Sequence, residues 1–176
     1  MTPEQFRAIA PLLIGWIKQT LTDHAGVARS VASFGFLRLS RYFSSELLTS
    51  AKVVVVDRVP TPPLSALGAT GFEDFENMDA AGITYLDTYF VQKGEAGKES
   101  LHFHELIHIV QWRLLGSDGF LAAYADGLAR FGYRNSPFEV MAYDMQDRFD
   151  TSPMPFNAEQ EVADALRASR QRDPTS

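Results

Sequence analysis

The sequence predicts an α+β fold, because two strand-like segments stand among longer stretches whose apolar residues recur at helical spacing. Residues 52–59 are rich in β-branched side chains, and they end at a proline-rich stretch that cannot continue inside a sheet. Residues 82–91 alternate their side chains between two faces, as a second strand would. Together these patterns indicate a small sheet with helices packed on it.

An N-terminal helix is predicted from the first residues onward. Thr2 suits the N-cap, Pro3 the first helical position and Glu4 the first turn. Residues 44–48 are expected to form a further, short helical turn. Apolar residues of the N-terminal helix form a stripe, which is expected to pack on the protein's own core, although a partner helix could also bind it: Phe6, Ile9, Leu13, Trp16, Ile17 and Leu21.

Four helices are predicted after the second strand, at residues 100–115, 120–131, 136–149 and 158–168. Gly116 is the expected C-terminal stop of the first of them. Residues 151–155 contain two prolines and break the chain before the last helix.

The length of 176 residues favours a single domain, 1–176. Within it, residues 1–80 carry the first helix and the first strand region, residues 81–150 form the central part, and residues 151–176 form a C-terminal helix and tail. Hydrophobic residues make up 45% of the chain, which is enough to build a core.

Composition restricts the partners and the compartment. The net charge is −6 and no basic block stands out, so no nucleic acid is expected as a partner. The chain has no cysteine, which excludes disulfides, thiolate metal sites and a cysteine nucleophile. With no signal peptide and no apolar run of the roughly 20 residues that a membrane span needs, a soluble, cytoplasmic protein without a membrane partner is expected.

His104, Glu105 and His108 form the pattern H-E-x-x-H within a predicted helix. Residues four apart on a helix lie on the same face, so both imidazoles can bind one metal ion. The glutamate between them can reach a water bound to that metal. This combination predicts the core of a zinc-dependent hydrolase.

A structural interpretation of these histidines competes with the metal site. His104 and His108 could be core residues hydrogen-bonded to the backbone, because the neighbouring residues are apolar. Two imidazoles and a glutamate on a buried face would be costly without a compensating partner, and this favours the metal. His102 points to a different face, where it is expected to support the site or lie at the surface, and His24 is isolated.

A catalytic zinc needs three protein ligands and one open position. Gln111 and Leu114 stand where a longer motif would place a glycine and a third histidine, so the third ligand must come from elsewhere. Glu139 is the candidate, on a following helix that Ala142 would allow to approach closely. Glu139 also completes a capping box with Ser136, which explains it without any metal. The remaining acidic candidates are Asp118, Asp126 and Asp144.

With these residues in place, residues 82–149 resemble the gluzincin branch of the zincin metallopeptidases. The resemblance consists of a strand, a loop, the H-E-x-x-H helix, and a later helix with Glu139 and Ala142 as E-x-x-A. The stretch also looks like compact metallopeptidase domains of bacteria, including toxin-associated ones. Residues 1–80 have no counterpart in it.

The resemblance implies a zincin-like fold, in which a small twisted sheet packs on the H-E-x-x-H helix with further helices below. It implies that the strand before the motif lies beside the cleft and pairs with an extended substrate backbone. Glu105 would be the general base. One position departs from the pattern, because Tyr143 stands where many gluzincins have aspartate, and Asp144 follows it. The implied ligands of one zinc ion are His104, His108 and Glu139.

These residues predict a zinc-dependent metallopeptidase that acts on a peptide or protein substrate. Zinc would lower the pKa of its bound water, and Glu105 would move the proton to the leaving amine. A phenol from Tyr143 or Tyr133 is a candidate to stabilise the oxyanion. Asp144 or Asp147 could orient a histidine ligand.

Other functions fit the same residues. Gln111 and Trp112 are expected in the core or the cleft wall, where they would fit any of these functions. A metal-dependent hydrolase of a non-peptide amide or ester would use the same ligands. A non-catalytic or latent metal-stabilised interaction domain would not need Glu105. Two imidazoles and a carboxylate also suit iron, cobalt or manganese.

Overall fold

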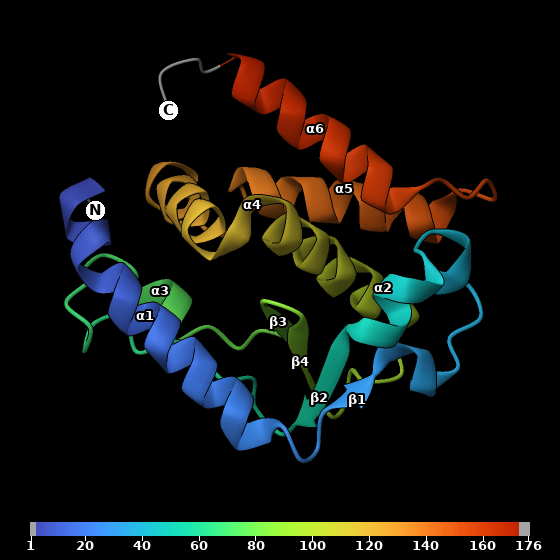
Figure 1. Cartoon of the computed structure of the whole chain (residues 1–176), viewed down its shortest axis with the longest axis horizontal. Helices are drawn as coiled ribbons and strands as arrows, with labels where there is room; N and C mark the ends of the chain where they lie inside the picture. The colour runs from blue at the N-terminus through green and yellow to red at the C-terminus, as the bar shows by residue number, and fades with distance from the viewer. Residues whose placement is uncertain (1–2, 173–176) are drawn as a thin grey trace.

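A computed structural model describes residues 3–172 of the chain (Figure 1). It has an α+β architecture with a small mixed sheet of four strands and several helices, as the sequence predicts at this level. The helix α1, Pro3–His24, begins where expected, but the proposed N-cap, Thr2, lies outside the described residues. Leu13 and Ile17 of its apolar stripe are buried, so the stripe packs on the protein's own core.

The sheet has the order β1-β2-β4-β3. The two-residue strand β1, Arg29–Ser30, is antiparallel to β2, Lys52–Val56. Strand β2 is parallel to β4, Thr88–Gln92, which is antiparallel to β3, Gly82–Tyr85. Strand β3 is therefore an edge of the sheet.

The prediction of one continuous strand over residues 82–91 is wrong. Leu86 adopts a left-handed backbone conformation with φ 57°, and the chain reverses there to form the hairpin of β3 and β4. Tyr85 pairs with Thr88 across the turn, which leaves Leu86 and Asp87 as its two central residues. Neither residue is a typical hairpin signal, and for that reason the alternating pattern concealed the turn.

Short helical elements precede β2. The predicted turn at residues 44–48 is the helix α2, Ser45–Ser50, whose N-cap side chain, Ser44, accepts a hydrogen bond from the Leu47 backbone N–H at 3.2 Å. Two 3-10 turns precede it, η1 at Val31–Phe34 and η2 at Leu39–Arg41.

The long helix α4, Glu99–Phe131, contains a break at Gly116, where φ is 69° and ψ is 172°. The two helices predicted on either side of Gly116 are therefore confirmed, but they join directly. The helix α5, Pro137–Thr151, packs against α4, and α6, Ala158–Arg172, also contacts it. In Figure 1, α5 and α6 lie on the side of α4 away from the sheet.

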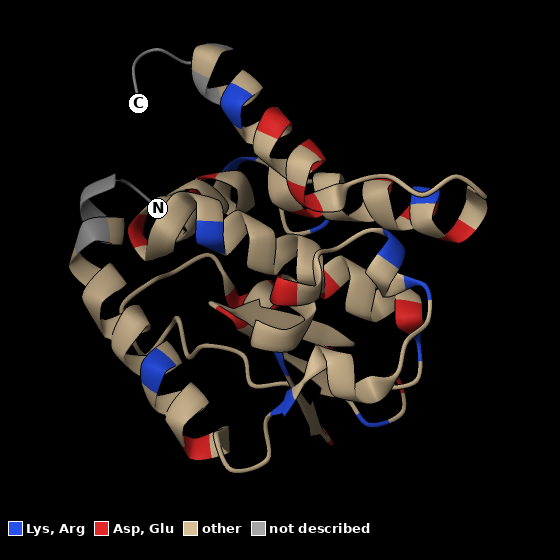
Figure 2. Cartoon of the chain, turned by 45° about the vertical axis from the view of Figure 1, so that its right-hand side comes forward, with Lys and Arg blue, Asp and Glu red and all other residues tan. Residues whose placement is uncertain are grey.

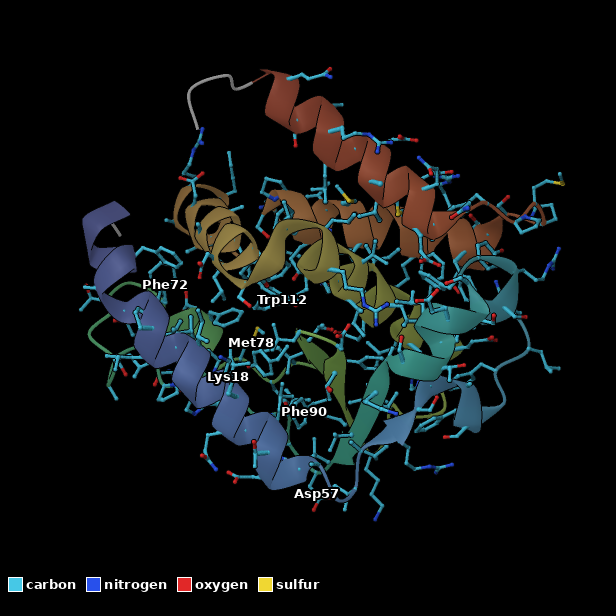
Figure 3. All side chains as sticks on the ribbon, in the orientation of Figure 1. Lys18, Asp57, Phe72, Met78, Phe90 and Trp112 are labelled. Atoms are coloured by element: carbon cyan, nitrogen blue, oxygen red, sulfur yellow. The ribbon has the colours of Figure 1, made fainter. Side chains whose placement is uncertain are left out.

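The first half of α4 is buried on all sides, and residues Phe103, Leu106 and Ile107 have no solvent exposure. Figure 3 shows side chains filling the layer between α1 and α4, with Phe72, Met78 and Trp112 among them. The helix α3, Glu73–Glu76, lies in the segment that joins β2 to β3. Acidic and basic positions of the described residues are distributed over helices and loops (Figure 2). No helix within residues 3–172 is long and apolar enough to cross a membrane.

Candidate metal centre

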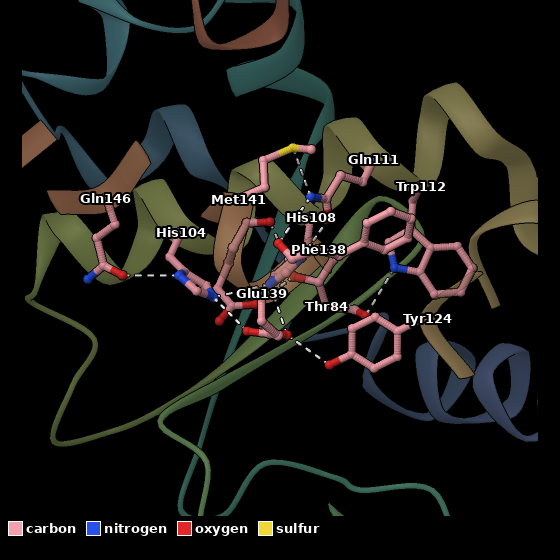
Figure 4. A network of polar contacts seen from close by, with 11 residues as sticks. Thr84, His104, His108, Gln111, Trp112, Tyr124, Phe138, Glu139, Met141 and Gln146 are labelled. Atoms are coloured by element: carbon pink, nitrogen blue, oxygen red, sulfur yellow. Dashed lines mark hydrogen bonds and ion pairs between the residues drawn. The ribbon is translucent and has the colours of Figure 1, made fainter. Parts of the chain in front are cut away.

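His104 and His108 lie one turn apart on the buried face of α4, as their spacing predicts. Their ring centroids are 4.8 Å apart, and the two Nε2 atoms approach to 3.1 Å. Figure 4 shows both rings directed at the same point. The helix thus brings two potential ligand atoms together.

Glu139 reaches the same point from the first turn of α5. Its Oε2 lies 3.4 Å from Nε2 of His104, and its Oε1 lies 3.4 Å from Nε2 of His108. Gly127 permits this approach, because a Cβ there would lie 3.0 Å from the Pro137 ring at the start of α5. Among the described residues, this His–His–Glu group is the one that could hold a metal ion.

The capping alternative for Glu139 does not match the geometry. The Ser136 backbone N–H donates to the Tyr133 carbonyl, and the Ser136 side chain makes no capping hydrogen bond. The Glu139 carboxylate instead points to the histidines. Ser136 Oγ is left buried without a hydrogen-bond partner.

Two glutamines fix the orientation of the imidazoles. Gln111 Oε1 lies 2.8 Å from Nδ1 of His108, and Gln146 Oε1 lies 3.0 Å from Nδ1 of His104. The Gln111 amide is itself oriented, because its Nε2 donates to the Phe138 carbonyl at 3.3 Å. An amide oxygen only accepts hydrogen bonds, so each Nδ1 carries a proton and donates it.

This orientation leaves the two Nε2 lone pairs facing each other in neutral imidazoles. Lone pairs 3.1 Å apart repel unless a proton or a metal cation lies between them. Ligands about 2.0–2.1 Å from a tetrahedral zinc ion stand about 3.4 Å from one another, which matches the separations here. Glu139 Oε2 is buried and has no hydrogen-bond partner, as expected for an oxygen that coordinates a metal ion. The donor set therefore fits a divalent cation.

The expected orienting role of Asp144 or Asp147 is wrong, because both side chains are exposed on the far side of α5. Gln111 takes part of that role, and it does so from a fully buried core position, as predicted. Asp118 and Asp126, the other candidate ligands, are exposed and stand outside the group.

Tyr124 supports Glu139 in a way that the sequence analysis missed. Its hydroxyl donates to Glu139 Oε1 at 2.8 Å, from the second half of α4. Burial, followed by the charge of Glu139, raises the pKa of Tyr124, so the phenol remains a donor. An aromatic residue with helical spacing to Phe120 carries no signal for this role.

The ionisation states of His108 and Glu139 depend on each other. Burial alone would lower the pKa of His108, but Glu139, Glu105 and the hydrogen bond that His108 donates to Gln111 outweigh it and raise this pKa to about 9. Burial opposes ionisation of Glu139, yet both histidines hold its pKa well below the usual range. Without a metal, the group therefore holds a proton between His108 and Glu139.

Glu105 turns toward the sheet edge. Thr84 of β3 donates to its Oε2 at 2.6 Å, and Gly82 leaves room for it, since a Cβ at Gly82 would lie 2.4 Å from Glu105 Oε1. Burial raises the pKa of Glu105, while His104 and His108 partly oppose that shift. Strand β3 thus provides both a donor and a gap for this carboxylate.

Trp112 contacts the same strand. Its indole Nε1 donates to the Thr84 carbonyl at 3.3 Å. That carbonyl is consequently not free to pair with a substrate backbone, as the strand beside the cleft was expected to do.

The two candidate phenols lie next to each other, because Tyr133 and Tyr143 share a side-chain hydrogen bond. The Tyr143 ring is half-buried, with its centroid 4.6 Å from that of His104 and the Arg134 guanidinium 4.7 Å from it. Tyr133 lies beside Phe75, at a centroid distance of 5.9 Å. Burial raises the pKa of both phenols, so both are neutral donors at pH 7.

The role expected for His102 is wrong. It is a fully buried core residue that packs against Phe36 and hydrogen-bonds to Tyr89 and Ala96, on the face of α4 that faces away from the metal group. His24 packs edge-on against Phe90.

No protein-family model matches the chain, and no curated protein or solved structure matches it either. The chemistry of the site therefore depends on its own geometry.

Proposed function

We propose that the protein is a zinc-dependent hydrolase of amide bonds with a zincin-like arrangement, and that it acts as a metallopeptidase. The observation that carries this proposal is the convergence of His104 Nε2, His108 Nε2 and the orphaned Glu139 Oε2, with Glu105 beside them. A purely structural metal site has no need of a further buried acid, such as Glu105, next to its three ligands. The strand–helix–helix order of residues 82–149 supports the gluzincin resemblance.

Different residues would bind the metal ion and orient its ligands. His104, His108 and Glu139 would hold the ion, while Gln111 and Gln146 keep the imidazoles oriented. Bound zinc supplies a Lewis acid and lowers the pKa of a coordinated water toward 7.

Glu105 is suited to move the proton. Its raised pKa brings it closer to neutrality, where a general base and acid is most effective. It would accept a proton from the attacking water at its carboxylate and deliver it to the leaving nitrogen. Thr84 would keep the carboxylate against β3 between these transfers.

The developing oxyanion needs a donor from the protein. Tyr143 is proposed for this role because it is half-exposed and contacts the His104 ring. Tyr133 is the second candidate, since it lines the apolar pocket that also includes His108 and Glu139.

One observation favours a different substrate class. The pocket beside the metal group is lined almost entirely by apolar side chains, which suits a non-peptide amide or ester as well as a peptide. The ligands and the base would be identical in both cases.

The test is cleavage of a peptide library by zinc-loaded wild-type protein and by the Glu105→Gln variant. Wild type should cleave, and the variant should lose activity by about 100-fold or more while it retains zinc. Glu46→Gln, at an exposed position on α2, is the matched control and should behave as wild type. Full activity of Glu105→Gln would remove this residue from the mechanism.

A further inference from the structure

A pocket extends from the metal group into the layer between α1 and α4. One end includes Glu105, His108 and Glu139. The walls come from α1, from the segment that joins β2 to β3, and from the second half of α4. Figure 3 shows Phe72, Met78 and Trp112 in this layer. Part of this wall comes from residues 1–80, for which the gluzincin resemblance offers no counterpart.

The pocket is apolar beyond its metal end. The α1 side chains that line it are Phe6, Ile9, Leu13 and Ile17. The hydroxyls of two lining tyrosines are already engaged, because Tyr85 donates to the Pro60 carbonyl at 2.7 Å and Tyr124 donates to Glu139. The third lining tyrosine, Tyr133, shares a side-chain hydrogen bond with Tyr143. The described walls therefore offer little to a polar ligand.

The lining of the pocket extends along α1. Its lining residues on α1 run from Phe6 to Ile17, a distance of about 16 Å at 1.5 Å per residue. A single amino-acid side chain fills only part of such a length. A peptide segment would bring a polar backbone unit about every 3.5 Å, and each unit would need a hydrogen-bond partner.

We propose that this pocket binds a long, unbranched acyl chain of the substrate, so that the carbonyl of its amide bond lies at the metal group. The proposal rests on the proposed hydrolase function. In the reaction, water adds across the C–N bond: its oxygen joins the acyl carbon, Glu105 carries one proton to the nitrogen, and a carboxylic acid and an amine result. The acyl chain remains in the pocket until release.

Chain-length dependence of binding tests the pocket separately from catalysis. The probes are acetylglycine, octanoylglycine and dodecanoylglycine, titrated calorimetrically into zinc-loaded Glu105→Gln protein. Affinity should rise by about twofold to fourfold per added methylene until the chain outgrows the pocket, so octanoylglycine, with six more methylenes, should bind at least about 60-fold more tightly than acetylglycine. An equal affinity across the series overturns the proposal.

A pocket-filling variant locates the binding. Ala125 lines the pocket from α4 and is half-buried, whereas Ala123 is exposed on the same helix. Ala125→Phe should lower octanoylglycine affinity about tenfold without changing zinc content, and Ala123→Phe should leave both unchanged. Equal binding by the two variants would contradict the pocket. The acylglycine titrations on Glu105→Gln protein test the pocket even if Ala125→Phe or Ala123→Phe does not fold.

The outcomes separate the two proposals. If wild type cleaves acetylated peptides but the acylglycine series is flat, the hydrolase stands and the acyl pocket fails. If the chelated protein still binds octanoylglycine but holds no zinc after reloading, the pocket stands and the hydrolase fails. Tighter binding of acetyl-trileucine than of octanoylglycine would also overturn the acyl chain as the occupant.

Discussion

His102 and the pair His104–His108 lie close together in α4, yet their surroundings differ in kind. His102 Nε2 donates to the Ala96 carbonyl, and its Nδ1 accepts from the Tyr89 hydroxyl, so both ring nitrogens have neutral partners. Burial lowers the pKa of His102, which keeps it neutral. On the other face, the two Nε2 atoms have only each other and Glu139.

The comparison shows what separates a structural histidine from a candidate metal ligand. A buried imidazole can be fully satisfied by a carbonyl and a hydroxyl, and then it needs nothing further. Two imidazoles that both donate from Nδ1 to amide oxygens have one remaining ring nitrogen each, and these two nitrogens face one point, where either a proton or a metal ion can bind. Charge and orientation, rather than burial, therefore distinguish the two faces of α4.

The largest expected effect comes from replacing a ligand rather than the structural histidine. His108→Ala should lower zinc affinity by more than about 100-fold, the upper end for loss of a mere orienting partner. His102→Ala should leave zinc affinity unchanged, but it should lower the free energy of unfolding by about 2–4 kcal/mol because it leaves the Tyr89 hydroxyl unpaired and opens a cavity. Competition with a zinc indicator and thermal unfolding measure the two. A loss of zinc in His102→Ala would erase the distinction.

A smaller effect is expected from Gly82→Ala, which alters neither histidine. The added Cβ would displace the Glu105 carboxylate from its place against β3. Misplacement of a catalytic group by about 1 Å can cost about 100-fold in rate, so turnover should fall by that order while zinc content is retained. The control is Gly94→Ala, where the added Cβ would have no atom within 4 Å, so turnover should not change. Unchanged turnover in Gly82→Ala would show that Glu105 does not depend on this gap.

The orienting glutamine should matter less than a ligand. Gln146→Leu removes the acceptor of the His104 Nδ1–H and keeps a similar volume. Zinc affinity should fall by about 10–100-fold, measured by competition with a chelator of known strength. The control is Gln160→Leu, an exposed position on α6 that bonds only within its own helix region. An equal affinity for both variants would mean that the Gln146 contact has no effect on the ligand.

The smallest effect is on pH dependence. Because the pKa of His108 in the metal-free protein is about 9, zinc must displace one proton below that pH. Apparent affinity should rise about tenfold per pH unit between pH 7 and 9, and then level off. Titration of zinc at several pH values measures the slope. A flat profile over this range would mean that no proton is held by the group.

Part of this site could be predicted from the sequence. The spacing of His104 and His108 within an apolar helical stretch was sufficient to place both rings on one face, because helix geometry is local. Glu139 could be named as a candidate from its position in the next helix, although the capping alternative remained open until the packing of α5 on α4 was known.

The rest depends on contacts between distant parts of the chain. The pairing of Gln146 with His104 joins residues 42 apart, and the gap at Gly82 exists only because β3 packs on α4. The hairpin at Leu86 was missed because the strand alternation continues through it without a glycine or an asparagine. No local pattern encodes these features.

The central claim is that a divalent cation binds between His104, His108 and Glu139. Crystals grown with zinc and measured on both sides of the zinc absorption edge test it most directly. We expect one anomalous peak per chain within bonding distance of both Nε2 atoms and the Glu139 carboxylate, and its disappearance in Glu139→Ala. The absence of a peak in zinc-saturated wild-type crystals, with the rings still 3.1 Å apart, would contradict the account.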